Sequence, residues 1–349
     1  MNIPALRLSS HNLHSPTLFR SPKDVITCMC AMQAQDFNMA KWGVGIRMNG
    51  CTDEMVQTAF ESGEIIRTHI MRPTWHFVTP EDITWILPLS SERIISSMKS
   101  RDVELGLNET IYAKSVNVII KALEGGKHLT REELSEIIGR AGIAVNSARM
   151  VHFMIYAEQR GIVCSGAMRD KQHTYALFDE RVPHAKSLSK DDAIARLAAR
   201  YFASHAPACL QDFAWWSGLP ASEARAGIEA IKSNLIAEII DSQTYFLPCD
   251  FKPQIEDESC HILPAFDEYL IAYRNRTAVL SPENHDKVIS SNGVFRPVII
   301  RNGKVSGLWK NDKKQSVKTE FFKKPNGRTK ELLDKAIEDY RRFLNEVKS

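Results

Sequence analysis

The chain has 349 residues, of which 44% are hydrophobic, and its 45 Lys and Arg against 42 Asp and Glu give a net charge of +3. This length corresponds to about two or three domains, and the hydrophobic content is ample for packed cores. A charge so near zero neither requires nor excludes a nucleic-acid partner, because a local basic face can exist within a near-neutral total. The sequence does argue against a membrane protein, since no run approaches the ~20 apolar residues of a transmembrane helix.

The N-terminal and cysteine patterns predict a cytoplasmic protein. The first residues, "MNIPALRLSSHNLHS", contain no apolar core of a signal peptide. The seven cysteines are an odd number without a CxxC pair, and Cys28 and Cys30 lie within an apolar run. We therefore expect buried thiols in a reducing compartment, with no metal site and no cofactor.

Residues 1–110 predict helices followed by a strand pair. Ser21-Pro22 begins a helix, and apolar residues recur after it at helical spacing: Val25, Ile26, Met29, Cys30 and Met32. A second helix starts at Thr52, with acidic residues in its first turn, and stops at Gly63. The segment "IIRTHIMRPTWHFVTPED" is rich in β-branched and aromatic residues, so it predicts two short strands around Arg72-Pro73.

The same order returns after residue 110. "IYAKSVNVIIKALEGG" is a helix closed by glycines, and "LTREELSEIIGRAG" has a capping box formed by Thr130 and Glu133. A third helix, "NSARMVHFMIYAEQRG", leads into "IVCSGAMRDKQHTYALFD", two strand-like runs joined by a basic turn. Three helices closed by a hairpin are the pattern of a winged helix.

A third set of helices and strands spans "KDDAIARLAARYFASHAP" to "LIAEIIDSQTYFLP", and the loose spacing between sets predicts a tandem array of similar modules. From "KPQIEDES" onward strands and turns dominate, including an Asn302-Gly303 hairpin turn. The last segment, "RTKELLDKAIEDYRRFLNEVK", is an amphipathic helix that we expect to pack back on the strands.

These elements predict an α+β fold of tandem winged-helix modules, each a helix-turn-helix with a β-hairpin wing. We place the modules at residues 1–110, 111–188 and 189–253, followed by a β-rich C-terminal element with a terminal helix at 254–349.

Five blocks of the sequence resemble, in family order, the AlkZ-type winged-helix DNA glycosylases. They are "MQAQD", "MRPTWHFVTPED", "YFASHAPACLQDFAWWSGLP", "ILPAFDEYLIAYRNR" and "IIRNGKVSGLWK". Each block alone is a weak signal, but five in order are specific, and they cover nearly the whole chain.

The resemblance implies a C-shaped arrangement of modules that excises alkylated bases from double-stranded DNA in base excision repair. It also implies a catalytic Gln-aliphatic-Gln motif, which falls here on Gln33 and Gln35. A sister branch of the family has Gln-aliphatic-Asp, so Gln35 places the chain on the AlkZ-like side. The chain departs from the family at Asn275, where relatives often have an aspartate before Arg276. No carboxylate role is therefore carried over to that position.

The chemistry of the glutamine side chain limits the range of bases that could be excised. A purine alkylated at N3 or N7 already carries positive charge and departs readily, so the enzyme need only place a water and stabilise an oxocarbenium-like sugar. A glutamine amide can accept from that water and donate to another group, but it is not a strong general base. On a continuous helix residues i and i+2 diverge, so either the helix breaks near Met32 or one glutamine alone touches the reacting centre.

Two nearby residues have alternative readings. Asp36 could orient water or stabilise positive charge, but we favour its acting as a cap for the turn "FNMAKWG". Lys41 shows no sign of a Schiff-base nucleophile, so we expect a monofunctional hydrolase. Without the family blocks, Gln33-Ala34-Gln35 would read as a plain helix C-terminus.

Candidates for DNA contact are Arg72 and His76 in the first hairpin, with Trp75 between them read as core. In the adjacent pair Trp215-Trp216, at most one indole is expected to be exposed. Further basic candidates lie mainly on predicted wings and the C-terminal hairpin, whose tips could enter a groove: Arg149, Arg169, Lys171, Arg274, Arg276, Arg301, Lys304 and Lys310. Asp267 is expected to be buried and structural.

Two other classes of protein remain open. A non-enzymatic winged-helix regulator would read DNA with helix 145–160, but it leaves the Gln-x-Gln block unexplained. A protein-binding module with degenerate winged helices would be expected to lack the basic wing residues, which are present. We expect a monomer, and the sequence does not choose between a methyl lesion, a bulky adduct and an interstrand crosslink.

Overall fold

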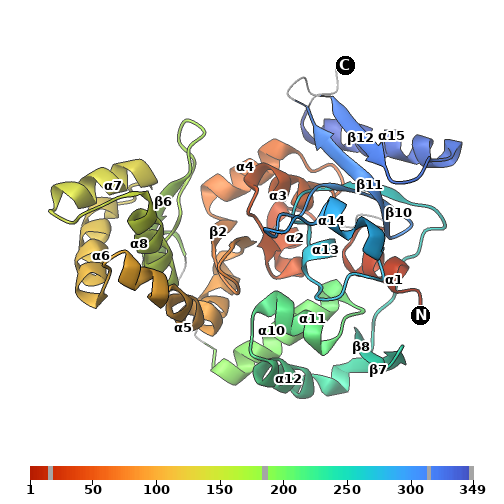
Figure 1. The fold of residues 1–349 in the computed structure, drawn as a ribbon, viewed down its shortest axis with the longest axis horizontal. Coiled ribbons are helices and arrows are strands. Elements are labelled where there is room, and N and C mark those ends of the chain that lie inside the picture. The colour runs from red at the N-terminus through yellow and green to blue at the C-terminus, as the bar shows by residue number, and fades with distance from the viewer. Residues whose placement is uncertain (15–18, 183–187, 313–315, 346–349) are drawn as a thin grey trace. The chain divides into compact units, whose positions relative to one another are not determined.

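The computed structural model describes residues 1–14, 19–182, 188–312 and 316–345. The chain forms two compact units: the first contains Met1–Gln57 and Ile194–Ser349, and the second contains Thr58–Ala193. Figure 1 shows both units in one view. The predicted module 1–110 thus contributes residues to both units. In the described residues, no helix is long and apolar enough to cross a membrane.

Four helices dominate the N-terminal part. They are α1 (Ile3–Ser10), α2 (Pro22–Met29), α3 (Phe37–Gly45) and α4 (Asp53–Ser62), with the short strand β1 (Met32–Gln33) between α2 and α3. The predicted helix start is confirmed, because Ser21 and Asp24 form a reciprocal capping box at α2. The segment "FNMAKWG", which we read as a turn, is helix α3, and α1 was not predicted.

The second unit begins within α4, and its first two strands, β2 (Ile66–His69) and β3 (Trp75–Val78), form a hairpin, as predicted. The strands are antiparallel, with Ile66 opposite Val78 and His69 opposite Trp75. The long helix α5 (Pro80–Glu104) follows and was not predicted. Its start is nonetheless ordinary, because the Thr79 side chain accepts a hydrogen bond from Asp82 N.

The rest of the second unit has the order helix, strand, two helices, two strands. These elements are α6 (Glu109–Leu123), β4 (Leu129–Thr130), α7 (Arg131–Arg140), α8 (Ser147–Gln159), β5 (Val163–Ser165) and β6 (Thr174–Leu177), with α9 (Phe178–Arg181) after them. The strand order is β4-β6-β5. The predicted capping box of Thr130 and Glu133 is present. Ile119, Leu134 and Phe153 are fully buried at the centre of this core.

A similar order recurs from residue 190. The elements are α10 (Lys190–His205), α11 (Leu210–Ser217), α12 (Ala221–Ala230), the 3-10 turn η1 (Lys232–Asn234), β7 (Leu235–Ile240) and β8 (Gln243–Pro248). Ala208, which lies between the first two helices, forms a β-bridge with Phe246 of β8. The bridge occupies the same place in the order as β4 does in the previous set.

The C-terminal part is β-rich, as predicted. Its sheet has the order β12-β11-β10-β9, built from β9 (Cys260–Leu263), β10 (Val298–Arg301), β11 (Lys304–Asn311) and β12 (Val317–Phe321). Between β9 and β10 lie α13 (Glu268–Ile271), η2 (Pro282–Asn284) and α14 (His285–Val288). The β10–β11 turn is at the predicted Asn302-Gly303, and both residues have positive φ, 49° and 77°.

The terminal helix α15 (Gly327–Phe343) packs back on this sheet, as predicted. The ring of Tyr340 lies 5.0 Å from Trp309 of β11 and 5.0 Å from Trp42 of α3. Phe343 is buried against the same tryptophan of α3 at 5.2 Å. Aromatic packing therefore joins α15, α3 and the sheet. The final residues of the predicted helix, 346–348, lie outside the described part.

The close approach of α15 to α3 generates a stability prediction. A Cβ on Gly45 would lie 2.5 Å from the Phe343 ring, whereas a Cβ on Gly43 would first meet the flexible end of Met32 at 3.3 Å. Gly45→Ala should therefore lower the free energy of unfolding by about 1–3 kcal/mol, despite the better helix propensity of alanine. Gly43→Ala is the matched control and should change it far less. Urea unfolding measures both, and equal effects would contradict this packing.

Candidate active site

The Gln-x-Gln motif lies in an irregular connection between two helices. Helix α2 ends at Met29, and Cys30 adopts a positive φ of 67°. Met32–Gln33 is then extended, Gln35 and Asp36 lie in a bend, and α3 begins at Phe37. The prediction that the helix loses regularity near Met32 is confirmed. The motif is therefore not the C-terminal turn of a helix.

The two glutamines differ in exposure. Gln33 is 6% exposed and Ala34 is fully buried. Gln35 and Asp36 are exposed. The motif thus has one glutamine embedded in the protein and one at its surface, on a segment only three residues long.

The backbone of Gln33 is bound to a buried carboxylate. Gln33 N donates a hydrogen bond of 2.6 Å to Oε1 of Glu268, a residue that is 1% exposed. The other oxygen of Glu268 accepts from Trp216 Nε1 at 3.0 Å. His205 Nε2 lies 3.6 Å from the same oxygen. Sequence reasoning missed Glu268, although two adjacent acidic residues in the apolar run "ILPAFDEYLIAY" were a usable signal.

A buried cluster of histidine and tyrosine lies behind Glu268. The His205 ring stacks on Tyr201 with centroids 4.8 Å apart. Tyr273 donates its hydroxyl hydrogen to His205 O at 2.8 Å, so its oxygen is left to accept from His11 Nε2 at 2.7 Å. This assigns the hydrogen of His11 to Nε2. The cluster belongs to the first unit throughout.

Burial keeps these histidines neutral. It lowers the pKa of His11 well below its ordinary 6.5, and nearby His205, Arg47 and Arg7 add to the effect. Burial also lowers the pKa of His205, against an opposing contribution from Glu268. At neutral pH neither ring carries a charge toward the glutamine segment.

Asp267 is buried and structural, as predicted. Its two carboxylate oxygens accept from Arg47 Nη2 at 2.8 Å and Nη1 at 2.9 Å, and both side chains are fully buried. Asp267 Oδ1 also accepts from Tyr269 N, which caps α13. The pair joins α3 to the turn that carries Glu268.

Asp36 is a helix cap, as favoured from the sequence. Its Oδ1 accepts from Met39 N at 3.1 Å at the start of α3. Lys41 is buried, and its Nζ lies 2.7 Å from Asp53 Oδ2 and 3.2 Å from Gln57 Oε1. The Lys41 amine is therefore already engaged by two side chains, which does not suit a Schiff-base nucleophile.

The Trp215-Trp216 pair splits as expected. Trp216 is fully buried on Glu268, whereas Trp215 is half-buried and donates to Ile271 O at 2.9 Å. Arg274 and Arg276 lie over the Trp215 ring, at 5.2 and 5.6 Å from its centroid. Asn275, the departure from the family pattern, accepts from Thr277 N and Oγ1 and so shapes the local turn.

The first hairpin contributes less to a DNA surface than predicted. His76 is fully buried, and its Nδ1 lies 2.9 Å from Thr74 O, so the expected phosphate contact is contradicted for this residue. Arg72 is half-buried. Trp75 packs against the core of the second unit, as its core reading predicted, and Arg67 lies over its ring at 4.3 Å.

The β5–β6 hairpin ends in an exposed basic turn. Asp170 and Lys171 have positive φ of 50° and 63°, and Arg169 and Gln172 exchange backbone hydrogen bonds across the turn. Arg169 also pairs with Glu133 at 2.5 Å. Lys171 is exposed at the turn itself.

The C-terminal hairpin is not free to enter a groove. A Cβ on Gly303 would lie 2.6 Å from Pro4 Cβ of α1, so the turn is packed on that helix. Tyr269 donates to Gly303 O at 2.8 Å. Arg301 pairs with Glu258 and donates to Ser259 O, while Lys304 and Lys310 are exposed. Helix α1 thus covers the tip at Gly303, whereas Lys304 beside it is exposed.

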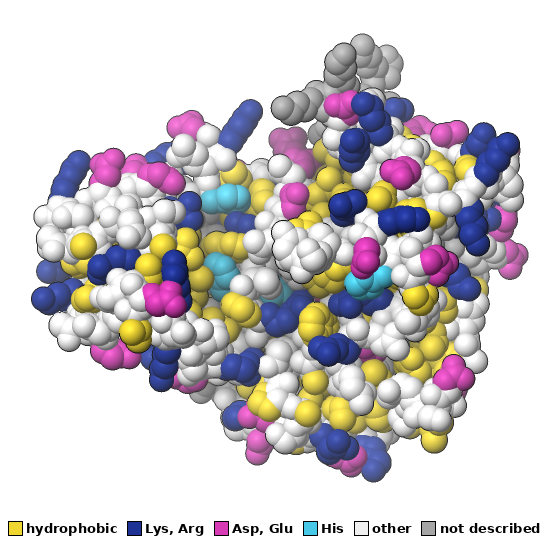
Figure 2. All heavy atoms as spheres, viewed as in Figure 1, with side chains coloured by type: hydrophobic (Ala, Val, Ile, Leu, Met, Phe, Trp, Pro, Cys, Tyr) yellow, Lys and Arg dark blue, Asp and Glu magenta, His cyan; other side chains and the backbone are white. Residues whose placement is uncertain are grey.

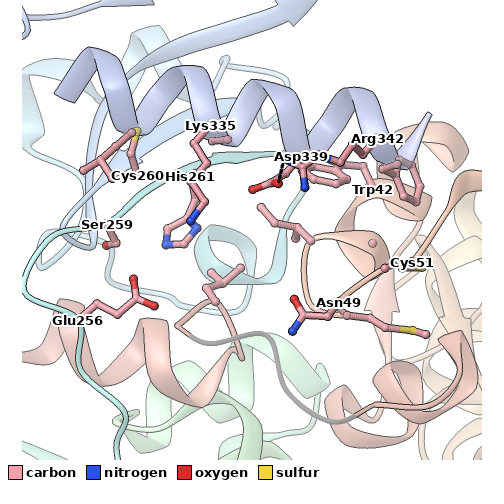
Figure 3. A pocket seen from close by; sticks show the side chains of 18 of the residues that line it. Trp42, Asn49, Cys51, Glu256, Ser259, Cys260, His261, Lys335, Asp339 and Arg342 are labelled. Atoms are coloured by element: carbon pink, nitrogen blue, oxygen red, sulfur yellow. Dashed lines mark ion pairs between the residues drawn. The ribbon is translucent and has the colours of Figure 1, made fainter. Parts of the chain in front are cut away.

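Figure 2 shows side chains of both charge signs spread over the visible face. Figure 3 shows a pocket of about 510 Å³ in the first unit, between α15 and the segment before β9. His261, Glu256, Asp339 and Arg342 line it, but neither motif glutamine does. Among the described residues, no group of His, Cys, Asp and Glu could hold a metal ion.

The chain is similar to known DNA glycosylases in both sequence and fold. Residues 26–343 match the family described as DNA glycosylase AlkZ-like. An interstrand DNA cross-link repair glycosylase from Streptomyces sahachiroi is 22% identical over 352 residues, covering 91% of this chain and 88% of its own. The solved structure of the Streptomyces sahachiroi DNA glycosylase AlkZ matches with a TM-score of 0.81 at 21% identity, covering 98% of this chain and 95% of that one.

The chain is thus a mixed helix-and-sheet protein of a class that acts on DNA bases. The family match spans most of the chain, so the chain belongs to the AlkZ-like DNA glycosylase family, a family of enzymes. The family resemblance drawn from the five sequence blocks is thereby confirmed.

The buried histidines generate a pH prediction. In the unfolded chain His11 titrates near 6.5, but its pKa in the folded protein is well below that value, so acid favours the unfolded state. Stability should fall as pH drops below ~6.5, by about 1.4 kcal/mol per pH unit for each such histidine. His11→Gln should reduce the slope of the free energy of unfolding against pH by the contribution of about one proton. Urea unfolding between about pH 7.5 and 5.5 measures this slope. His285→Gln, at an exposed histidine, is the control and should leave the slope unchanged.

Proposed function

We propose that this enzyme hydrolyses the N-glycosidic bond of cationic alkylated purines, N7 and N3 adducts, in double-stranded DNA. The observation that carries the proposal is the irregular, non-helical Gln33-Ala34-Gln35 segment, which is bound through the backbone of Gln33 to buried Glu268. Because the name of the Streptomyces relative specifies interstrand cross-links, such lesions belong among the substrates to be tested.

The proposed chemistry uses the amides of Gln33 and Gln35. One amide oxygen accepts from a water whose oxygen forms the new bond to C1′, while the bond from C1′ to the base nitrogen breaks. The electrons of that bond neutralise the positive charge of the alkylated base, and the attacking water releases a proton to solvent. No strong general base is required, which restricts the reaction to lesions that are already charged.

DNA would be held by tandem winged-helix modules. The order α6, β4, α7, α8, β5, β6 is that of a helix-turn-helix with a hairpin wing, and α10 to β8 repeats it with the Ala208 bridge in place of a strand. In this reading α8 faces a groove and the exposed turn at Lys171 contacts the backbone. Arg169, Arg274, Lys304 and Lys310 are exposed and remain candidates for phosphate contact.

A non-enzymatic winged-helix regulator is the alternative. It would use the same modules and basic turn, but it would give no role to the glutamine segment. Membership in a glycosylase family favours the enzyme.

Base excision is the direct test. Wild-type protein in excess over duplex DNA with one N7-alkylguanine or N3-alkyladenine should release the base, and alkaline cleavage should then reveal abasic sites. Gln33→Ala and Gln35→Ala should each lower the single-turnover rate constant by roughly 10- to 100-fold, because each misplaces the water. Asn38→Ala removes an exposed amide on α3 and should leave the rate unchanged.

No release by wild type from either lesion would overturn the proposed reaction. Equal rates for wild type and both glutamine variants would leave the enzyme standing and remove the glutamines from its mechanism. A cross-linked duplex in the same assay tests whether bulky lesions are accepted.

The exposed wing turn generates a binding prediction. Lys171→Glu should weaken binding to undamaged duplex DNA, and it should make log K less steep against log salt concentration, by about 0.9 per lost phosphate contact. Lys114→Glu makes the same charge change on the exposed side of α6 and is the matched control. Fluorescence anisotropy between 50 and 200 mM salt measures both. Equal slopes for the two variants would remove this turn from the DNA surface.

A further inference from the structure

A buried carboxylate needs strong partners, since removing it from water is costly unless hydrogen-bond donors replace the water. Glu268 has such donors on both oxygens. Oε1 accepts from Gln33 N at 2.6 Å, and Oε2 accepts from Trp216 Nε1 at 3.0 Å. The residue is 1% exposed.

The partners of Glu268 come from separate parts of the first unit. Gln33 belongs to β1, Trp216 to α11, and Glu268 itself to α13. The residue before it, Asp267, is fixed by the doubly hydrogen-bonded Arg47, which lies just after α3. The carboxylate is therefore held in place from several sides, independently of the glutamine segment that it binds.

We propose that Glu268 is a positioning residue of the glycosylase reaction, fixing the Gln33 peptide and thereby the direction of both motif side chains. The inference rests on the function proposed above. A hydrogen bond from an amide to a charged carboxylate is about twice as strong as one between neutral groups. It orients the Gln33 peptide plane, and the exposed Gln35 follows two residues later on the same backbone.

Replacing the carboxylate by an amide tests this with little change in shape. In Glu268→Gln one oxygen remains to accept, but the NH₂ group must face either the Gln33 N–H or the Trp216 Nε1–H, which are both donors. One orientation breaks the bond to Gln33, and the other keeps it only as a weaker bond to a neutral amide that Trp216 no longer anchors, so the Gln33 peptide should be held less firmly in both. We expect the single-turnover excision rate constant to fall by about tenfold or more, with the Kd for damaged DNA within about twofold of wild type.

Asp212→Asn is the matched control. Asp212 lies on α11 and, like Glu268, is a buried carboxylate that is 1% exposed. It accepts hydrogen bonds from Arg274 N at 2.8 Å and from Cys209 N at 3.2 Å. The substitution likewise removes a buried charge and costs stability. It touches neither glutamine, so the excision rate of the folded protein should stay near wild type.

Amide hydrogen exchange supplies a readout that does not depend on activity. A peptide spanning residues 30–37 should exchange faster in Glu268→Gln than in wild type, and Asp212→Asn should leave that peptide unchanged. If Glu268→Gln does not fold, Trp216→Phe replaces it, because it removes the donor to Oε2 and loosens the carboxylate. It should also speed exchange of the same peptide and lower the rate, by a smaller factor.

The outcomes separate the two proposals. A wild type that releases no alkylated base defeats the proposed function, whatever the exchange data show. An active wild type with Glu268→Gln at the same rate and the same exchange defeats the positioning role. A loss of rate shared equally by Asp212→Asn also defeats it, since the effect would then be one of general stability.

Discussion

Two consecutive buried carboxylates, Asp267 and Glu268, tie the beginning of the chain to its C-terminal third. Asp267 holds the guanidinium of Arg47, and Glu268 holds the backbone of Gln33. A buried carboxylate is costly unless donors replace the lost water, and each of these two has donors of its own. The segment from Gln33 to Arg47, with the cap at Asp36 and helix α3, is thereby held at both ends. The position of the glutamine motif follows from this constraint.

The ionisable groups around the motif suit a reaction that needs no general acid. The ionisable rings behind Glu268, His11 and His205, are neutral because burial lowers the pKa of each. Lys41 is bound to Asp53, so its charge is already compensated. The two rings therefore carry no imidazolium proton to donate in the chemistry proposed for Gln33 and Gln35. A charged purine that leaves without protonation fits such a site better than a neutral base, which would need an acid.

The sequence predicted local features well, because they depend on neighbouring residues. The Ser21 cap, the Asp36 cap, the Thr130 capping box and the Asn302-Gly303 turn are all set by contacts within four residues. Helix α5 was missed because its buried side mixes Ser90, Ser91 and Asp102 with aliphatic residues, which weakens the periodic pattern. Glu268 was missed because its contact with Gln33 spans 235 positions, and no local rule describes such a pair.

The hairpins show why a motif for a turn is not a motif for a function. Asp170-Lys171 and Asn302-Gly303 both place two consecutive residues at positive φ, so the backbone of each turn is similar. Lys171 is exposed, but Gly303 is packed on Pro4 and accepts from Tyr269. What separates them is the first helix, which was not foreseen and which covers one tip. A basic residue near a predicted hairpin is therefore a DNA candidate only after the structure shows that nothing of the same chain occupies the tip.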